Sequence, residues 1–372
     1  MIRSYGEKER AWLWVNDVLG SNVSLTERLL FCNDGIMSLF ESVKKRQTAE
    51  FPEQISAYQK KELIKRCSEA YIDSLIDNME KRGIYAVSRD DAGYPKLLRE
   101  IYDPPTVLYI KGKAPGEIKL PIAVIGSRNC SDYGREMAAY FGRELALHGA
   151  CIVSGLAAGC DSEAARGALS ASENCFPTVA VLGCGVDVVY PSSSRELYER
   201  ILEKGSVISE FKPGKSPTRE SFPQRNRIIS GLSKGVLVIE AGAKSGTRTT
   251  VEFAHEQCRD VFAVPGRITD LLSVGTNGLI KSGAAKAVFA ADDILYEYGM
   301  FLEDPLLPIH SVDLSKLEPR PRKVCELLIL GEKSADSICE LTGFSVAEVN
   351  SYLTELELSG IIKQLPNGEY AV

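Results

Sequence analysis

The chain has 372 residues, enough for two or three domains, and its composition, 44% hydrophobic and 25% charged, is that of an ordinary globular protein. Its formal net charge of −6 argues against a nucleic-acid partner for the surface as a whole. No apolar run approaches the ~20 residues of a membrane span, and the charged N-terminus lacks the apolar region of a secretory signal. We therefore expect neither a membrane helix nor a signal peptide.

The ten cysteines and three histidines show no pattern of a metal site or a disulfide framework. The sequence has no C-x-x-C pair, and His148, His255 and His310 are scattered singly. Cys151 and Cys184 lie in or beside apolar runs, where cysteine behaves as a small hydrophobic residue. We predict no metal ion, no cofactor and a reducing, cytoplasmic location.

Residues 1–85 are predicted to form a helical domain. Apolar residues recur at three- and four-residue spacing in three segments, 7–20, 25–45 and 60–83. Asn22 or Ser24 can cap the second segment, and Gly83 ends the third. Residues 86–117 are rich in Pro and Tyr and are predicted to be a connector, which becomes strand-like at Thr106 to Lys111.

Residues 118–300 alternate between two patterns. Short β-branched runs, most of them ending at a glycine, are LPIAVIGS, ACIVSGL, TVAVLGCG, SVISEF, GVLVIEA and DVFAVPG. Helical segments such as YGREMAAYFGRELALHG and TTVEFAHEQCR lie between them. Apolar strands that alternate with helices predict an α/β fold, doubly wound around a mostly parallel sheet, and such sheets bind ligands at the carboxyl ends of their strands. The pattern does not give the strand order.

The C-terminal residues form a separate pattern. Residues 301–319 are a proline-containing linker, and residues 320–372 contain three amphipathic helices followed by two apolar runs around Pro366-Asn367-Gly368. This order predicts a small winged helix. The expected recognition helix, SVAEVNSYLTELELSG, carries Glu348, Glu355 and Glu357 but no Lys or Arg. We therefore expect the tail to contact protein rather than duplex DNA, and its deletion to leave single-strand affinity nearly unchanged.

Two turns after predicted strands are candidate phosphate sites. AVIGSRNCSDYG lacks the G-x-G-x-x-G dinucleotide fingerprint, but Gly126, Ser127 and Arg128 precede a helix whose first amides favour an anion. In the next turn, VSGLAAGCDSEAARG, the corresponding residues are Ser154, Gly155 and Gly159. Asp161 is interpreted as structural, as the N-cap of the following helix.

The strongest signal is the segment ESFPQRNRIISGLSKG, residues 220–235, which we interpret as a loop. Eight basic and two acidic residues lie between Lys212 and Arg248, so this part carries six net positive charges and the rest of the chain twelve net negative charges. A local field of this kind attracts a polyanion. Phe222 is either a stacking platform for a base or a core anchor. The other candidates for DNA contact in this segment and just before it are Arg219, Arg225, Asn226 and Arg227.

A further turn, IEAGAKSGTRTTVEFA, places Lys244, Ser245, Gly246 and Thr247 at a helix start, which again favours phosphate. Its spacing is not that of a Walker A motif. The sequence has no G-x-S-x-G elbow and no H-E-x-x-H motif, and we found no convincing catalytic set. We expect that the protein is not an enzyme.

The chain resembles the DprA/Smf family of bacterial DNA-processing proteins. The resemblance spans roughly residues 94–287 and depends on the segments YPKLLREIYDPPTVLYIKG, AVIGSRNCSDYG, VSGLAAGCDSEAARGAL, FPQRNRIISGLS, LVIEAGAKSGT and VFAVPGRITDLLSVGTNGLIKSGA. The helical N-terminus resembles the family's sterile-alpha-motif-like domain, and the tail resembles its optional winged helix. The chain departs from the family pattern at Ala165, where histidine is common, and at Arg248, where an aliphatic residue is expected.

The resemblance implies an extended Rossmann-like domain that binds single-stranded DNA without hydrolysing it. Members protect incoming strands in natural transformation, load the RecA recombinase and act as dimers. The family's phosphate pocket maps onto Ser127, Arg128, Ser154, Gly155 and Gly159. To these the resemblance adds Phe222, Arg225, Asn226 and Lys244.

Two other functions fit parts of the sequence. Rossmann-like nucleoside-monophosphate phosphoribohydrolases also begin with a GS turn, but their P-G-G-x-G-T-x-x-E motif is absent, and Glu252 lies five residues after Thr247 instead of three. Two extra residues rotate a side chain away from the expected position on a helix. A transcription factor with a ligand-sensing domain is the third interpretation, and the acidic recognition helix argues against it.

Overall fold

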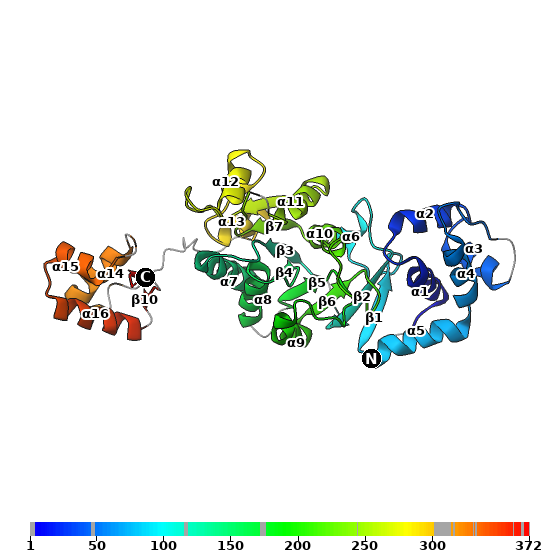
Figure 1. The fold of residues 1–372 in the computed structure, drawn as a ribbon, viewed down its shortest axis with the longest axis horizontal. Coiled ribbons are helices and arrows are strands. Elements are labelled where there is room, and N and C mark those ends of the chain that lie inside the picture. The colour runs from blue at the N-terminus through cyan, green and yellow to red at the C-terminus, as the bar shows by residue number, and fades with distance from the viewer. Residues whose placement is uncertain are drawn as a thin grey trace. The chain divides into compact units, whose positions relative to one another are not determined.

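The computed structural model describes residues 4–45, 49–114, 118–171, 176–243, 245–300, 314, 317–329, 331, 333–359, 361–365 and 368–371. The chain divides into two compact units, Met1–Phe301 and Leu302–Val372 (Figure 1). No helix in these described ranges has the length and apolar character needed to cross a membrane.

The first unit is built on a nine-stranded sheet with the order β1-β2-β6-β5-β4-β3-β7-β8-β9. Pairing is parallel from β6 to β9, which confirms the α/β class and the mostly parallel sheet. The six apolar runs correspond to β3 through β8. The parallel strands are β3 (Leu120–Ile125), β4 (Ala150–Ser154), β5 (Thr178–Val181), β6 (Ser206–Ser209), β7 (Gly235–Val238), β8 (Asp260–Ala263) and β9 (Lys286–Ala287).

The strand order reverses at β3. From β3 the chain proceeds outward through β4, β5 and β6 on one side and then through β7, β8 and β9 on the other. The crevice beyond the carboxyl ends of two strands at such a reversal is the usual ligand site of an open α/β sheet. The turns that follow β3 and β7 meet at this point.

The predicted connector, residues 86–117, also belongs to the sheet. It contributes most of β1 (Ile84–Ser88) and all of β2 (Val107–Gly112), which pair with each other in antiparallel register, and β2 then pairs with β6. The strand expected at Thr106 to Lys111 is β2. Between the two strands lies the short helix α6 (Lys96–Arg99).

Helices cover both faces of the sheet (Figure 1). Buried residues of α8 and α9 pack in one cluster with inward side chains of β5 and β6, whereas those of α10 and α11 pack in another with the opposite side chains of the strands. This arrangement explains why the central strands are apolar throughout. The helices are α7 (Asp132–Leu147), α8 (Cys160–Ser170), α9 (Arg195–Lys204), α10 (Ser221–Gly231), α11 (Thr247–Glu256), α12 (Val274–Lys281) and α13 (Asp292–Glu297), with a short 3-10 turn at Ser192–Ser194.

The N-terminal region is helical, as predicted, but its second and third segments are each divided. The second breaks around Asp34 and Gly35, whose φ angles are 53° and 103°, and the third breaks before Ser68, which caps the next helix. Asn22 caps the second helix by accepting from the Leu25 amide. The helices are α1 (Glu7–Leu19), α2 (Val23–Phe31), α3 (Ile36–Lys44), α4 (Ala57–Arg66) and α5 (Glu69–Lys81).

The second unit is the predicted winged helix. Three helices, α14 (Pro319–Ile329), α15 (Ala335–Thr342) and α16 (Val346–Leu358), precede an antiparallel pair of strands, β10 (Lys363–Gln364) and β11 (Tyr370–Ala371). Val324, Leu328, Ile338, Val349 and Leu353 form its core. The hairpin is confirmed, although Pro366 and Asn367 at its tip lie outside the described residues, as does most of the predicted linker.

Candidate nucleic-acid interface

A hollow of about 600 Å³ lies where the strand order reverses. We call it the first hollow. Most of its lining comes from the turn after β3, from α10 and from the start of α11, and Ala157, Asp161, Tyr190 and Arg219 complete it. The predicted site residues among its lining are Gly126, Ser127, Arg128, Arg219, Phe222, Arg225 and Asn226. Seven of the predicted residues, from two separate parts of the sequence, therefore line one hollow.

The segment FPQRNR is helical, not a loop. Helix α10 begins at Ser221, so Pro223 stands in its first turn, where the missing amide hydrogen needs no partner. Phe222, Arg225 and Asn226 follow the three- and four-residue spacing of one helix face and line the first hollow. Arg227 lies on a different face. The helical period therefore separates the two arginines, which a loop would not do.

Arg225 is buried in the wall of the first hollow and is 4% exposed. Its Nη1 donates to the carbonyl oxygen of Gly155 at 2.8 Å and to that of Val181, and thereby connects the ends of β4 and β5. Burial lowers the pKa of Arg225 to about 10, so the side chain is still charged at neutral pH. Its Nε has no partner among the described residues. Arg225 thus contributes a fixed positive charge to the wall and has little freedom to move.

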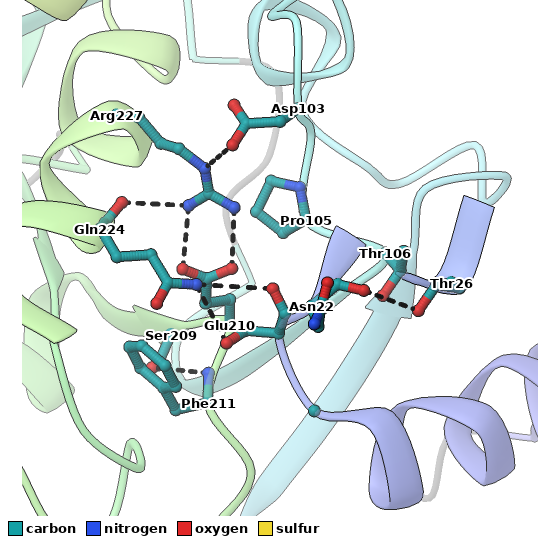
Figure 2. Close-up of polar contacts among 12 residues, drawn as sticks. Asn22, Thr26, Asp103, Pro105, Thr106, Ser209, Glu210, Phe211, Gln224 and Arg227 are labelled. Atoms are coloured by element: carbon teal, nitrogen blue, oxygen red, sulfur yellow. Dashed lines mark hydrogen bonds and ion pairs between the residues drawn. The ribbon is translucent and has the colours of Figure 1, made fainter. Parts of the chain in front are cut away.

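Arg227 points away from the first hollow, and the structure does not bring it to the predicted site. It is 3% exposed, and its two Nη atoms donate to the two carboxylate oxygens of Glu210 at 2.9 and 2.8 Å (Figure 2). Its Nε donates to Asp103 at 2.7 Å. Such a buried, fork-shaped pair fixes the position of a helix. Arg227 therefore anchors α10 to the end of β6 and to the segment before β2.

Arg128 and Arg219 are the exposed cations of the first hollow. Neither forms an ion pair with any residue that the structure describes. The guanidinium of Arg128 lies over the ring of Phe222 at 5.5 Å, which is cation–π distance. These two side chains can reach a ligand without first breaking an ion pair with a described residue.

Phe222 is half-buried at the wall of the first hollow and does not enter the apolar core. Its ring centroid lies 5.5 Å from that of Tyr190, which is 46% exposed and also lines the hollow. The sequence analysis did not single out Tyr190, because its aromatic neighbour lies 32 residues away in the chain. The two rings, inclined to each other by 35°, together offer a partly exposed aromatic surface.

The N-terminal ends of two helices at this edge of the sheet, α7 and α8, already have a carboxylate nearby. At the start of α7, Glu240 accepts from the Ser131 amide at 2.9 Å and from its hydroxyl. In the first turn of α8, Asp161 accepts from the Gly155 amide at 2.8 Å, and burial raises its pKa while the charge of Arg225 opposes that rise. The expected N-cap role of Asp161 was wrong, because Gly159, with φ 80°, is the N-cap.

The start of α11 differs from both. Its N-cap is Gly246, which has no side chain to accept the first amides, and Ser245 accepts only weakly from the Thr247 amide at 3.3 Å. Thr249 and Thr250 in the first turn of α11, which the sequence analysis did not single out, also line the first hollow. The helix dipole and these donors favour an anion in the first hollow at this point.

The remaining predicted residues lie behind the surface or outside the described part. Ser154 is fully buried, and its hydroxyl has no partner in the described ranges. Gly159 lies so close to the Ser127 and Arg128 carbonyls that a Cβ would collide with them, so it shapes the turn after β3 without touching the first hollow. Gly155 similarly accommodates the guanidinium of Arg225. Lys244 lies outside the described residues.

The geometry of the rival enzyme is not present at Glu252. This carboxylate pairs with Arg248 at 2.9 Å on the exposed side of α11 and does not line the first hollow. Within the described ranges, no cluster of His, Cys, Asp and Glu has a metal-binding arrangement.

Comparisons with known proteins agree with the fold. The family "DNA recombination-mediator protein A" matches residues 85–299, and the "DprA winged helix domain" matches residues 313–368. Protein Smf of Synechocystis sp. is 32% identical over 330 residues, which cover 79% of this chain and 82% of that protein. Protein Smf of Escherichia coli is 37% identical over 305 residues, or 80% of each.

Two solved structures are similar. The X-ray structure of DNA processing protein A from Streptococcus pneumoniae has a TM-score of 0.63 and 33% identity, and covers 79% of this chain and 99% of that one. DNA processing protein A from Helicobacter pylori, whose structure is described in terms of its single-stranded DNA binding mode, has a TM-score of 0.52 and 29% identity over 58% of this chain and 95% of that one. With both of its domains matched in order and its relatives covered over most of their length, the chain belongs to the DprA/Smf family of DNA-processing proteins.

Proposed function

We propose that the protein binds single-stranded DNA in the first hollow, largely independently of base sequence. The observation that carries this proposal is that several groups suited to single-stranded DNA line the same hollow. Two exposed arginines without carboxylate partners, an aromatic pair and an open helix start all line one hollow at the reversal of the sheet. Single-strand sites combine such a basic groove with aromatic rings on which bases stack.

Each group has a separate task in this mechanism. A backbone phosphate lies at the start of α11, where amides and threonine hydroxyls donate to it, and Arg128 and Arg219 neutralise its charge. A base stacks on Phe222 and Tyr190. The buried charge of Arg225 adds a constant positive potential behind them. Most of these contacts go to phosphate or to a ring face, so they do not distinguish one base from another.

Family membership supports the wider role. We infer that the protein protects single strands and helps to load RecA onto them in DNA uptake and recombination, and that it acts in the cytoplasm as a homodimer without catalysis. The name of the Helicobacter pylori structure, which refers to single-stranded DNA binding, supports the choice of ligand. The loading role requires that RecA assemble faster on a strand when the protein is present, and unchanged assembly would exclude it.

The test is a titration with single- and double-stranded oligonucleotides at about 50 and about 200 mM salt, where phosphate contacts differ strongly in strength. We expect preference for the single strand and much weaker binding at the higher salt. Arg128→Ala should bind poly-dT about ten-fold more weakly, since one charged contact to phosphate is lost. The fold should be unaffected because Arg128 is exposed.

Arg200→Ala is the matched control. Arg200 is also exposed and without an ion pair in the described part of the chain, but it lies on α9, against the other face of the sheet. If Arg128→Ala binds poly-dT as the wild type does, or if both variants lose affinity equally, the first hollow is not the site. Release of ribose 5-phosphate from AMP would instead favour the phosphoribohydrolase.

A further inference from the structure

A second hollow, of about 470 Å³, lies on the other side of the start of α11. One part of its wall is apolar and includes Val251 of α11 and Val274 and Leu279 of α12. Gly275 and Gly278 also line it. The second hollow thus combines an apolar wall with polar side chains, Ser245, Thr247, Arg248 and Ser282, and Gly278 leaves space between them. Such a mixed lining suits a flat group with an apolar face and a polar edge.

The two hollows are continuous. Ser245 and Thr247 line both of them, so the first residues of α11 form a low ridge between the two. The ridge is the point where the open helix start favours an anion. An anionic group bound there therefore has one aromatic hollow on one side and one partly apolar hollow on the other.

We propose that the second hollow is the binding site for the neighbouring nucleotide of the same strand. A backbone phosphate occupies the ridge, the base on one side stacks on Phe222, and the base on the other side enters the second hollow. This inference rests on the proposed function, and it assigns to the second hollow a ligand class, an unpaired nucleobase of any sequence. The covalent order of a strand, base–phosphate–base, matches the order hollow–ridge–hollow.

Arg248 supplies a further contact at the rim. Its side chain is 78% exposed, and its ion pair with Glu252, itself 55% exposed, is of the weak surface kind. The guanidinium can therefore leave Glu252 and cover the face of a bound base, as arginine does in single-strand sites. Arg248 can thus contact a base, whereas an aliphatic residue at the same position would only extend the apolar wall of the second hollow.

Gly278 allows the second hollow to be filled without damage to the fold. A Cβ built there meets no atom within 4 Å, and the residue lies inside α12 with no left-handed φ angle. Gly278→Leu should therefore fold at least as well as the wild type, since leucine is a better helix former than glycine. Its side chain would occupy the second hollow and would leave the first hollow untouched.

The experiment compares thymidine 5′-monophosphate with oligo-dT of increasing length. Gly278→Leu should bind the mononucleotide as the wild type does, because this ligand fills the first hollow and the ridge alone. From the dinucleotide onward we expect about ten-fold weaker binding, the effect of losing one stacked or buried base. Gly278→Ala adds a single methyl group and should show a much smaller loss.

Lys281→Leu is the control for added bulk, because Lys281 is exposed on α12 and lines neither hollow. Wild-type affinity of Gly278→Leu for every length would overturn the second subsite, and so would an equal loss in Lys281→Leu. Both results are distinct from failure of the proposed function, in which the wild type itself does not prefer single strands and Arg128→Ala has no effect.

Discussion

Two pairs of arginines at the same edge of the sheet differ in what holds them. Arg128 and Arg219 stand in turns, are exposed and have no ion pair among the described residues. Arg225 and Arg227 stand on α10, are 4% and 3% exposed and donate to carbonyl oxygens or carboxylates. The four arginines at this edge of the sheet therefore have two different roles: the buried pair holds the fold together, and the exposed pair is available to a ligand.

The difference teaches where charge is available to a ligand. If a buried guanidinium moved away from its partners, those partners would stay buried without a hydrogen bond, which costs free energy. The guanidinium therefore does not move to contact a phosphate. An exposed guanidinium loses only contacts with water. Substitution of the buried pair should therefore change the stability of the fold, and substitution of the exposed pair should change affinity.

The largest effect is expected from Arg227→Ala. It leaves Glu210, which is 1% exposed, as a buried carboxylate without its main partner, and removal of one member of such a pair costs about 3–5 kcal/mol of unfolding free energy. Thermal or denaturant unfolding measures this loss. The affinity of the remaining folded protein for poly-dT should stay within a factor of a few, because Arg227 does not line the first hollow.

The double variant Arg227→Met/Glu210→Leu is the control for this prediction. When both charged partners are replaced by apolar side chains of similar volume, most of the lost stability should return. An Arg227→Ala protein with wild-type stability and greatly reduced affinity would reverse the comparison and assign Arg227 to the DNA site.

Much of the fold followed from the sequence because its signals are local. A β-branched run that ends at a glycine, followed by a helical period, gave β3 through β8 and their covering helices. The divisions of the N-terminal helices were missed because apolar spacing continues across Cys32–Gly35 and Cys67–Ser68, and only the backbone angles there reveal the turn. Strand β1 was missed because its pairing with β2 joins residues 19 to 27 positions apart.

The site was predicted less completely, for a similar reason. The turn residues Gly126 to Arg128 were identified because a strand end and a helix start are visible in the sequence. Residues 220–235 were interpreted as a loop, although Pro223 is tolerated in a first helical turn, and the helical period decides which arginine lines the first hollow. The partners of Arg227 and the contact of Tyr190 with Phe222 depend on tertiary packing, which no local pattern encodes.

The next effect in size is expected from the exposed pair. The double variant Arg128→Ala/Arg219→Ala should retain its unfolding free energy within about 0.5 kcal/mol, as is usual for surface substitutions. The slope of log affinity for poly-dT against log salt should become shallower by roughly 1.4, since each phosphate contact on a single strand contributes about 0.7. Binding measured at four or more salt concentrations gives this slope. An unchanged slope with lower affinity would mean that the arginines act by packing on Phe222 and not by neutralising phosphate.

The smallest effect is expected from deletion of the C-terminal unit. Its helix α16 has no Lys or Arg, so it extends the comparison to a helix without basic side chains. The exposed face of α16 carries Glu355 and Glu357, and the exposed apolar side chains of Val346 and Leu358, 56% and 85% exposed, lie near its two ends. Such a surface repels phosphates and suits a protein partner. Deletion of residues 320–372 should therefore change poly-dT affinity by less than about two-fold and leave the salt slope unchanged, because no phosphate contact is removed. A large loss of affinity would require basic side chains elsewhere in this unit, such as Lys323 beside Phe344, to contact the strand.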